Sequence, residues 1–156
     1  MSKKDLAILG GDAVINSNFQ KYNPIGTEEI NAAKDVIKTG VLSQFVGAHD
    51  QDFYGGPKVK EFEEGFAQYI GRDQKALAVN SATSALELTA QLCQLKKGDE
   101  VIIPSHTYTS SAYPFIKQGA KIVWADIDLK TRVISQDTIK KCITEKTRVI
   151  VAPHLY

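Results

Sequence analysis

A turn rich in small and hydroxyl side chains, Asn80-Ser81-Ala82-Thr83-Ser84-Ala85-Leu86, has the chemistry to hold a phosphate group. Its small side chains leave the backbone open to an anion, and the hydroxyls of Ser81 and Thr83 can donate hydrogen bonds to phosphate oxygens. A helix that begins here adds free backbone N–H groups and the positive end of its dipole. The alternative is an ordinary helix cap without a ligand, because Asn, Ser and Thr are common cap residues. The residues alone leave both interpretations open.

A second polar turn, Pro104 to Ser111, follows the next predicted strand. The carboxyl ends of parallel strands meet at one edge of a sheet, so we expect this turn to face the same crevice as the first. The ring of Tyr108 can stack on a flat ligand and keep its hydroxyl available to solvent or substrate. The alternative is that Tyr108 fills the core and that His106 is a hydrogen-bonded loop residue.

No residue pattern in the sequence is typical of a metal site. Asp126 and Asp128 flank one residue, with Thr131 beyond them, but a calcium loop needs many more oxygen ligands at set spacing. An acidic turn with side-chain to backbone bonds explains the same residues. Cys93 and Cys142 lie far apart without a Cys-x-x-Cys motif, and the histidines are dispersed. We therefore predict reduced, packed thiols and no bound metal.

Short apolar runs alternate with helical patterns in the second half of the chain, which is typical of parallel strands joined by crossover helices. The fold class is therefore α/β with a mostly parallel sheet. The predicted strands are Ala76–Asn80, Glu100–Pro104, Lys121–Asp126 and Thr147–Ala152, with a short extended piece at Arg132–Ile134. The predicted helices are Thr83–Leu95, Thr109–Lys117 with Pro114 in its first turn or at a kink, and Gln136–Ile143.

Two further helices are predicted before this region. One spans about Thr27–Lys38, with Thr27 as its N-cap, acidic residues in its first turn and Gly40 as a left-handed stop. The other spans about Pro57–Ile70, and proline is favoured at the first position of a helix. The apolar spacing of both predicts amphipathic helices.

The organisation of the chain follows from these elements. Residues 41–56 are loop-like, which predicts a functional or subunit-contacting loop. We predict an N-terminal helix and loop segment at residues 1–56 and a main domain at residues 57–156. The chain stops at Val151–Tyr156, directly after a predicted strand and without a helix to cover it, so we expect a fragment of a longer protein.

The composition is that of one ordinary globular domain, with 156 residues, 43% hydrophobic and 24% charged. The 19 basic and 18 acidic residues are scattered and give a net charge of +1, so no electrostatic feature indicates nucleic acid or an anionic membrane as partner. No apolar run approaches the roughly 18 to 20 residues of a membrane span, and the first residues are too polar for a signal peptide. These features predict a cytoplasmic protein.

Taken together, the motifs resemble the DegT/DnrJ/EryC1/StrS family of pyridoxal-phosphate-dependent sugar aminotransferases. The agreement is collinear over nearly the whole chain, and it lies in the order and spacing of motifs that are not specific singly. The matching segments are Gly10-Gly11, Gly26-Thr27-Glu28-Glu29, Thr39-Gly40-Val41-Leu42-Ser43, Gly55-Gly56-Pro57-Lys58-Val59, Glu61-Phe62-Glu63, Ala78 to Leu86, Gly98-Asp99-Glu100-Val101-Ile102, Pro104 to Tyr108, Gly119-Ala120, Asp126-Ile127-Asp128 and His154-Leu155-Tyr156.

The resemblance implies the aspartate-aminotransferase architecture (fold type I), a three-layer α/β/α arrangement in which residues 57–156 form an incomplete large domain. It implies pyridoxal 5'-phosphate as the cofactor, with Ser81, Ala82 and Thr83 at the phosphate and Tyr108 stacked on the pyridine ring. Many members have Ser-Gly-Thr where this chain has Ser-Ala-Thr. Alanine lacks the freedom of glycine at positive φ, but its methyl is small enough for a phosphate to approach.

The resemblance also implies an activity for the parent protein: transfer of an amino group from an amino acid, glutamate or glutamine, to a nucleotide-linked keto-sugar. This chemistry belongs to polysaccharide or antibiotic sugar biosynthesis. It further implies a homodimer, in which residues 41–56 help to shape the substrate pocket of the partner subunit.

The resemblance places two catalytic groups beyond Tyr156, namely the Schiff-base lysine and the aspartate that pairs with the pyridine nitrogen. This chain therefore supplies no catalytic residue, and we expect it to be inactive alone. One alternative is a sugar dehydratase of the same family, in which histidine replaces the lysine. Another is a non-catalytic remnant that binds a phosphate compound or a partner subunit.

Overall fold

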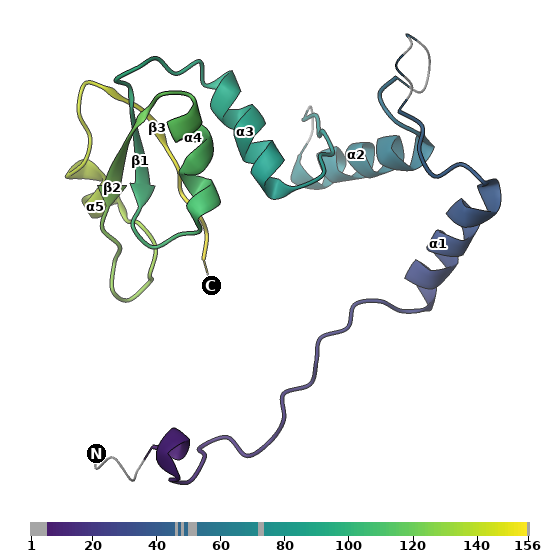
Figure 1. The fold of residues 1–156 in the computed structure, drawn as a ribbon, viewed down its shortest axis with the longest axis horizontal. Helices are drawn as coiled ribbons and strands as arrows, with labels where there is room; N and C mark the ends of the chain where they lie inside the picture. The colour runs from purple at the N-terminus through teal and green to yellow at the C-terminus, as the bar shows by residue number, and fades with distance from the viewer. Residues whose placement is uncertain (1–5, 46, 48, 50–52, 72–73, 156) are drawn as a thin grey trace. The chain divides into compact units, whose positions relative to one another are not determined.

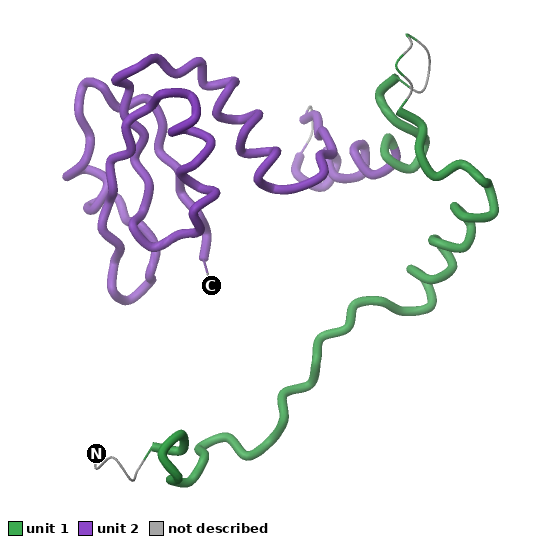
Figure 2. Tube along the Cα trace, in the orientation of Figure 1, with its two compact units in different colours: residues 1–60 green, residues 61–156 purple. Residues whose placement is uncertain are grey.

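A computed structural model describes residues 6–45, 47, 49, 53–71 and 74–155. The chain divides into two compact units, residues 1–60 and residues 61–156, which are coloured separately in Figure 2. The division falls inside helix α2 (Pro57–Ile70), just after the predicted boundary between residues 56 and 57. The assignment of residues 57–156 to one domain stays a prediction.

The second unit contains a parallel sheet of three strands in the order β2-β1-β3 (Figure 1). Glu100 of the central strand pairs with Lys121 of β2, and Ile102 pairs with Val123 on one side and Ile150 on the other. Every residue of β1 is buried, as expected for a strand that is covered on both faces. The predicted α/β class with a parallel sheet is confirmed. The strands are β1 (Glu100–Pro104), β2 (Lys121–Ala125) and β3 (Thr147–Ile150).

The core of this unit joins the sheet to helices α3 and α4. Ala90 of α3, Val101 and Ile103 of β1, and Phe115 of α4 belong to one buried cluster. Phe115 is the largest side chain among them and is 1% exposed. Burying a phenylalanine stabilises a fold by about 1.5–3 kcal/mol relative to leaving it in water. The helices of the unit are α3 (Ala82–Leu92), the 3-10 turn η3 (Thr109–Ser111), α4 (Tyr113–Lys117) and α5 (Gln136–Lys140).

The predicted strand Ala76–Asn80 is wrong. These residues belong to no strand ladder in the described part of the chain. The N–H of Ala78 instead donates to Oε1 of Glu63, on α2, at 2.7 Å. An apolar run predicts burial or extension, but a strand also requires a neighbouring ladder, and the sequence of the run does not specify one.

Several other elements differ from the prediction in length. The helix predicted at residues 109–117 is divided into η3 and α4, and Pro114 lies in the first turn of α4 as predicted. Residues 132–134 form no strand, because Arg132 adopts a left-handed φ of 59° and donates its N–H to the carbonyl of Asp128. Four elements end earlier than predicted, at Leu92 (α3), Ala125 (β2), Lys140 (α5) and Ile150 (β3).

In the first unit, α1 (Thr27–Thr39) is capped differently from the prediction. Its N-cap is Gly26 and not Thr27. The Gly26 N–H donates to Oε2 of Glu29 at 2.7 Å, and this bond holds the pKa of the Glu29 carboxyl below its ordinary value. Gly40 ends the helix with a left-handed φ of 72°, as predicted. The unit also contains a 3-10 turn, η2 (Ala7–Leu9).

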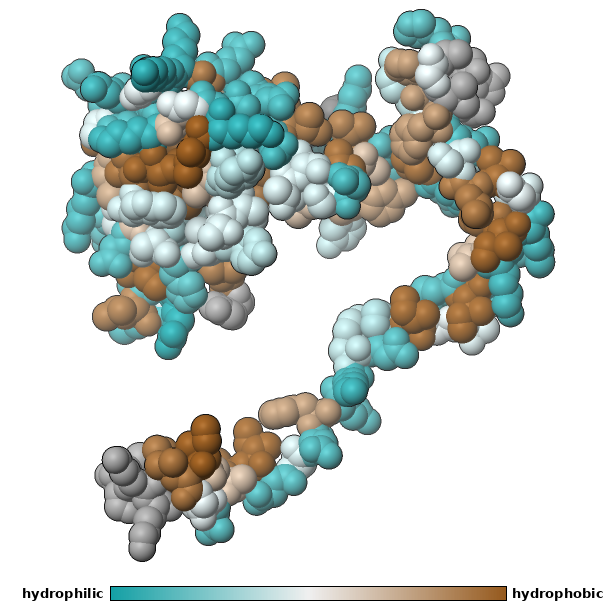
Figure 3. All heavy atoms as spheres, in the orientation of Figure 1, coloured by the Kyte–Doolittle hydropathy of each residue, from teal (hydrophilic) through white to brown (hydrophobic). Residues whose placement is uncertain are grey.

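Helices α1 and α2 have amphipathic sequences, yet neither contains a buried residue. In α1, Ile30 and Ile37 are exposed, and in α2, Phe62 and Phe66 are exposed. Figure 3 shows apolar side chains along α1 on the visible face. Both helices are therefore defined by their local signals and not by burial. Within the described residues, no helix combines the length and the apolar character needed to cross a membrane.

Glu100 connects three segments at the amino end of the sheet. Its side chain is almost wholly buried and accepts hydrogen bonds from Thr144 Oγ1 at 2.6 Å and from Lys121 Nζ at 3.0 Å. The hydrogen bond from Thr144, followed by that from Lys121, holds the pKa of the Glu100 carboxyl below its ordinary value. The ionised form is therefore the one that the folded structure stabilises.

We expect Glu100→Gln to lower the free energy of unfolding of the full-length protein at neutral pH. Because the folded-state pKa is lowered, the stabilisation from Glu100 is complete above the unfolded-state pKa of about 4.3 and is lost as the pH falls through the folded-state pKa. Urea unfolding of wild type and variant at several pH values measures the difference. The difference should narrow below about pH 4.3, and a gap that is independent of pH would contradict the prediction.

Candidate functional site

The predicted phosphate turn is an N-capped helix start. Ser81 is the N-cap of α3 in an extended conformation (φ −162°, ψ 157°), and its Oγ accepts the N–H of Ser84 at 3.1 Å. The sequence predicted Ser81 at this turn, and the structure assigns its oxygen to the cap. Asn80 and Ser84 join it, because Ser84 Oγ donates to Asn80 Oδ1 at 2.6 Å. The Ser-x-x-Ser spacing of a cap residue and the third helical residue was the signal available in the sequence.

The first helical turn leaves a set of hydrogen-bond donors free for a ligand. The amides of Ala82 and Thr83 occupy the first two helical positions, which have no acceptor within a helix. No hydrogen bond to either amide, or to the exposed Thr83 hydroxyl, is present among the described residues. N–H and O–H donors beside the positive end of a helix dipole are the groups that bind a phosphate dianion. The donor set of Ala82 and Thr83 therefore fits a phosphate.

The second predicted turn begins at the carboxyl end of β1. The Ser105 N–H donates to the carbonyl of Ala125 at 2.9 Å and continues the ladder past the strand. Thr107 Oγ1 and Ser111 Oγ lie 2.9 Å apart, and Ser111 is buried, so the turn is fixed from within. Tyr108 lies between them with its side chain 76% exposed. Tyr108 is thus a surface residue available to a ligand, and the core-filling alternative is wrong.

The two turns lie at the same end of the second unit. Figure 1 shows β1 ending at the end of the sheet where α3 begins. Contacts between α3 and η3 join the helix to the second turn. His106 is half-buried. The expectation that Thr83 and Tyr108 flank one crevice stays a prediction.

Glu63 is a further residue of this region that the sequence did not single out. It lies on α2, is half-buried, and accepts the Ala78 N–H at 2.7 Å. Ala78 stands two residues before Asn80. Glu63 therefore fixes the extended segment that leads into the phosphate turn. A helical carboxylate bound to a distant backbone amide has no local sequence signal, so only the structure reveals it.

The acidic residues after β2 are occupied by local hydrogen bonds. Asp128 Oδ1 accepts the N–H groups of Lys130 and Thr131, each at 2.9 Å, and Asp126 Oδ1 accepts the N–H of Ile127. The bonds from the Thr131 and Lys130 amides hold the pKa of the Asp128 carboxyl below its ordinary value. This arrangement is the acidic turn that the sequence predicted as the alternative to a metal site.

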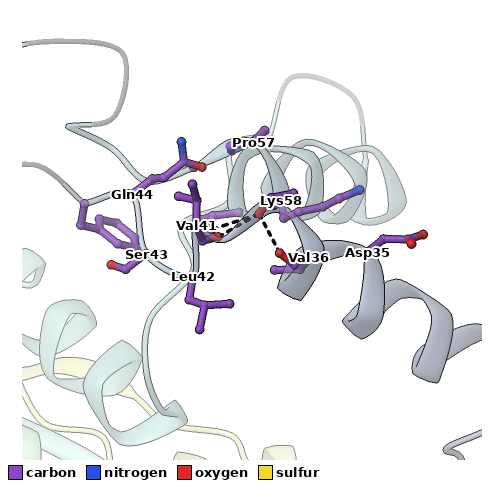
Figure 4. A pocket seen from close by; sticks show the side chains of 12 residues that line it. Asp35, Val36, Val41, Leu42, Ser43, Gln44, Pro57 and Lys58 are labelled. Carbon is purple, nitrogen blue, oxygen red and sulfur yellow. Dashed lines mark hydrogen bonds between the residues drawn. The ribbon is translucent and has the colours of Figure 1, made fainter.

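A cavity of about 480 Å³ lies within the first unit (Figure 4). It is lined by residues from the end of α1, from the loop 41–45 and from the start of α2. Two glycines make close contacts here: a Cβ on Gly55, whose φ is +95°, would lie 2.9 Å from the ring of Phe45, and a Cβ on Gly56 would collide with the Gln44 amide. The apolar lining residues are Val36, Val41, Leu42, Phe45 and Val59.

Comparisons of the sequence and of the structure with known proteins agree on one family. The sequence model of the DegT/DnrJ/EryC1/StrS aminotransferase family matches residues 25–156. The chain is 35% identical to the putative sugar aminotransferase Spr1654 from Streptococcus pneumoniae in its PMP form, with a TM-score of 0.69 over 86% of this chain and 31% of that chain.

Two further solved structures are similar to this chain. An aminotransferase from Psychrobacter cryohalolentis is 27% identical, with a TM-score of 0.74 over 88% of this chain and 32% of that chain. The E. coli GDP-4-keto-6-deoxy-D-mannose-3-dehydratase with bound hydrated PLP is 26% identical, with a TM-score of 0.72 over 84% of this chain and 32% of that chain. The chain thus spans about a third of the length of these proteins.

We expect Glu63→Ala to speed hydrogen exchange at the Ala78 amide in the full-length protein, because the amide loses its acceptor. Glu63→Gln should have an intermediate effect, since its amide oxygen still accepts a hydrogen bond but carries no charge. Residue-resolved hydrogen exchange measures both. The matched control is Glu64→Ala, which removes the exposed neighbouring carboxylate. An Ala78 exchange rate that is equal in wild type and Glu63→Ala would show that the contact does not hold the segment.

Proposed function

This chain belongs to the DegT/DnrJ/EryC1/StrS aminotransferase family, and from that membership we propose that the full-length protein is an aminotransferase acting on a nucleotide-linked keto-sugar. The amino donor would be glutamate or glutamine. The family uses pyridoxal phosphate, which supplies, when bound, the electron sink that lets an amino group leave its donor. The observation that carries the proposal is the family match over residues 25–156 together with the free donors at the start of α3.

Each residue of the phosphate turn has a distinct role in this proposal. The Ala82 and Thr83 amides donate to the phosphate oxygens, and the Thr83 hydroxyl adds a third donor. Ser81 acts as the N-cap: its Oγ accepts the Ser84 N–H and so fixes the direction in which α3 begins. Together these groups bind and orient the cofactor through its phosphate, and the helix dipole favours the dianion.

Tyr108 is proposed to stack its exposed ring on the pyridine ring of the cofactor. The hydrogen bonds of Ser105 and Ser111 hold the turn on both sides of Tyr108, which supports this role. A stacked aromatic excludes water from one face of the cofactor and restricts its tilt. The reaction also requires the lysine and the aspartate that the family resemblance places beyond residue 156.

The loop 41–56 is proposed to shape the substrate pocket of a partner subunit in a homodimer. Within the first unit, residues 41–45 line the apolar cavity described above, and a Cβ added at Gly55 or Gly56 would meet the side chains of Phe45 and Gln44. Binding residues are often carried on loops that regular elements position, and this loop lies between α1 and α2 in the sequence.

A sugar dehydratase is the second candidate, and one observation favours it. The chain is 26% identical to the E. coli GDP-4-keto-6-deoxy-D-mannose-3-dehydratase, with a TM-score of 0.72, so the two activities share this part of the fold. The cofactor binding that we propose for residues 1–156 is compatible with either reaction. The residue at the position of the Schiff-base lysine, lysine or histidine, decides between the candidates.

We expect Thr83→Val to weaken binding of pyridoxamine phosphate to the full-length protein by about 10- to 150-fold, the equivalent of one hydrogen bond to a charged group at about 1.5–3 kcal/mol. Binding of pyridoxamine, which has no phosphate, should change little. Calorimetric titration with the two compounds measures both affinities. Equal affinity of wild type and Thr83→Val for pyridoxamine phosphate would remove Thr83 from the site.

Two variants serve as controls for this measurement. Thr89→Val makes the same change six residues further along α3, where the hydroxyl donates to the Ala85 carbonyl, and should leave both affinities unchanged. Tyr108→Ala should lower the affinity for both compounds by a similar factor, because stacking acts on the ring that they share. Tyr108→Phe keeps the ring and should bind both as wild type does.

We expect the full-length protein loaded with pyridoxal phosphate to form 2-oxoglutarate from glutamate, or 2-oxoglutaramate from glutamine, in the absence of any sugar. An aminotransferase completes this half of its reaction without the acceptor. Measuring one equivalent of oxo acid per active site in a single turnover supports the proposal. Production of no oxo acid from either donor, with the cofactor bound, would contradict it.

A further inference from the structure

The side chains of Asn80, Ser81 and Ser84 are connected by a series of hydrogen bonds at the start of α3. Ser84 Oγ donates to Asn80 Oδ1 at 2.6 Å, and the hydroxyl oxygens of Ser81 and Ser84 lie 3.0 Å apart. Ser81 Oγ also accepts the Ser84 N–H at 3.1 Å. These hydrogen bonds connect Asn80, the residue before the cap, to the Ser81 cap and to Ser84 in the first turn of the helix.

The number of available protons determines which hydroxyl is the donor in each of these hydrogen bonds. A serine hydroxyl carries one proton, and an amide oxygen can only accept. The Ser84 proton points to Asn80 Oδ1, so the proton between the two serines must come from Ser81. Ser81 thus donates to Ser84 Oγ and accepts from the Ser84 N–H. Its one hydroxyl proton is therefore used inside the turn.

Neighbouring residues of the turn therefore differ in whether they still have a proton to donate to a ligand. The Ser81 hydroxyl has no proton left to donate to a phosphate, whereas the Ala82 and Thr83 amides and the Thr83 hydroxyl keep theirs. Asn80, Ser81 and Thr83 are all exposed, so water competes for every bond in the turn. An internal chain of hydrogen bonds reduces the number of conformations that the turn can adopt before a ligand binds.

We propose that Asn80 and Ser84 are positioning residues, which hold the Ala82 and Thr83 donors in place for the phosphate while binding no ligand themselves. The proposal rests on the proposed function, because it assumes a cofactor phosphate at this turn. It assigns a role to Ser84 that the cap alone does not require, since the cap uses only the Ser84 amide and the Ser81 oxygen.

The test compares pyridoxamine phosphate with pyridoxamine as ligands of the full-length protein. Ser84→Ala and Asn80→Ala each remove one end of the bond between these residues. Each should weaken pyridoxamine phosphate binding by about 2- to 12-fold, the range of one net hydrogen bond, and leave pyridoxamine binding unchanged. The double variant should be no weaker than either single variant, because both remove the same bond. Ser84→Thr keeps the hydroxyl and should restore the affinity.

The matched control is Thr138→Ala in α5. Thr138 is the third helical residue behind the Ser135 cap, as Ser84 is behind Ser81, and its hydroxyl also takes part in the cap. Thr138→Ala should leave the affinity for pyridoxamine phosphate unchanged. The ³¹P resonance of the bound phosphate should shift in Ser84→Ala and not in Thr138→Ala, because only the former alters the donors around the phosphate.

The outcomes separate this inference from the proposed function. If wild type binds pyridoxamine phosphate no more tightly than pyridoxamine, the phosphate site itself is wrong and this inference falls with it. If wild type discriminates but Ser84→Ala and Asn80→Ala bind pyridoxamine phosphate as tightly as wild type or more tightly, only the positioning role is overturned. If these variants bind both compounds more weakly by the same factor, without a ³¹P shift, the two residues have a general structural role. That result would also overturn the positioning role.

Discussion

The ladder around β1 determines where the second unit can present its functional groups. β1 pairs with β2 on one side and β3 on the other, and all of it is buried. Parallel strands place their carboxyl ends at one edge, so the turn after Pro104 can only open there. The bond from Ser105 to Ala125 extends the ladder into that turn. Helix α3 shares the buried core with β1 through Ala90 and contacts η3, so it lies beside the turn that follows β1.

The two ends of the sheet have contrasting chemistry. At the amino end, the buried carboxylate of Glu100 is bonded to Thr144 and Lys121, as a buried charge must be. At the carboxyl end, the amides of Ala82 and Thr83 are exposed donors with no acceptor of their own in the helix. The first arrangement stabilises the fold, and the second supplies the donors that we propose for the cofactor phosphate.

Local signals were predicted well, and tertiary pairing was not. Both ends of α2 agree with the sequence, because proline at the start and glycine after Ile70 act through the backbone of their own turn. The cap of α1 was misplaced by one residue: Gly26 has no cap side chain, and the Glu29 carboxylate instead accepts the Gly26 N–H, which is the reciprocal bond of a capping box. The strand predicted at Ala76–Asn80 failed because its apolar pattern carries no information about a neighbour. For the same reason the Glu63 contact was not predictable.

The cap and the phosphate site were weighed as alternatives in the sequence, yet the structure makes them compatible. The Ser81 cap satisfies the amide of the third helical residue, Ser84, and leaves the first two amides free. A capped helix start is therefore still a donor site. The departure from the family's usual glycine has a similar explanation. Ala82 lies inside α3, and the only described non-glycine residues with positive φ are Gln94 and Arg132, so position 82 does not need the freedom of glycine. The methyl group of Ala82 restricts the turn without removing the amide that a phosphate would contact.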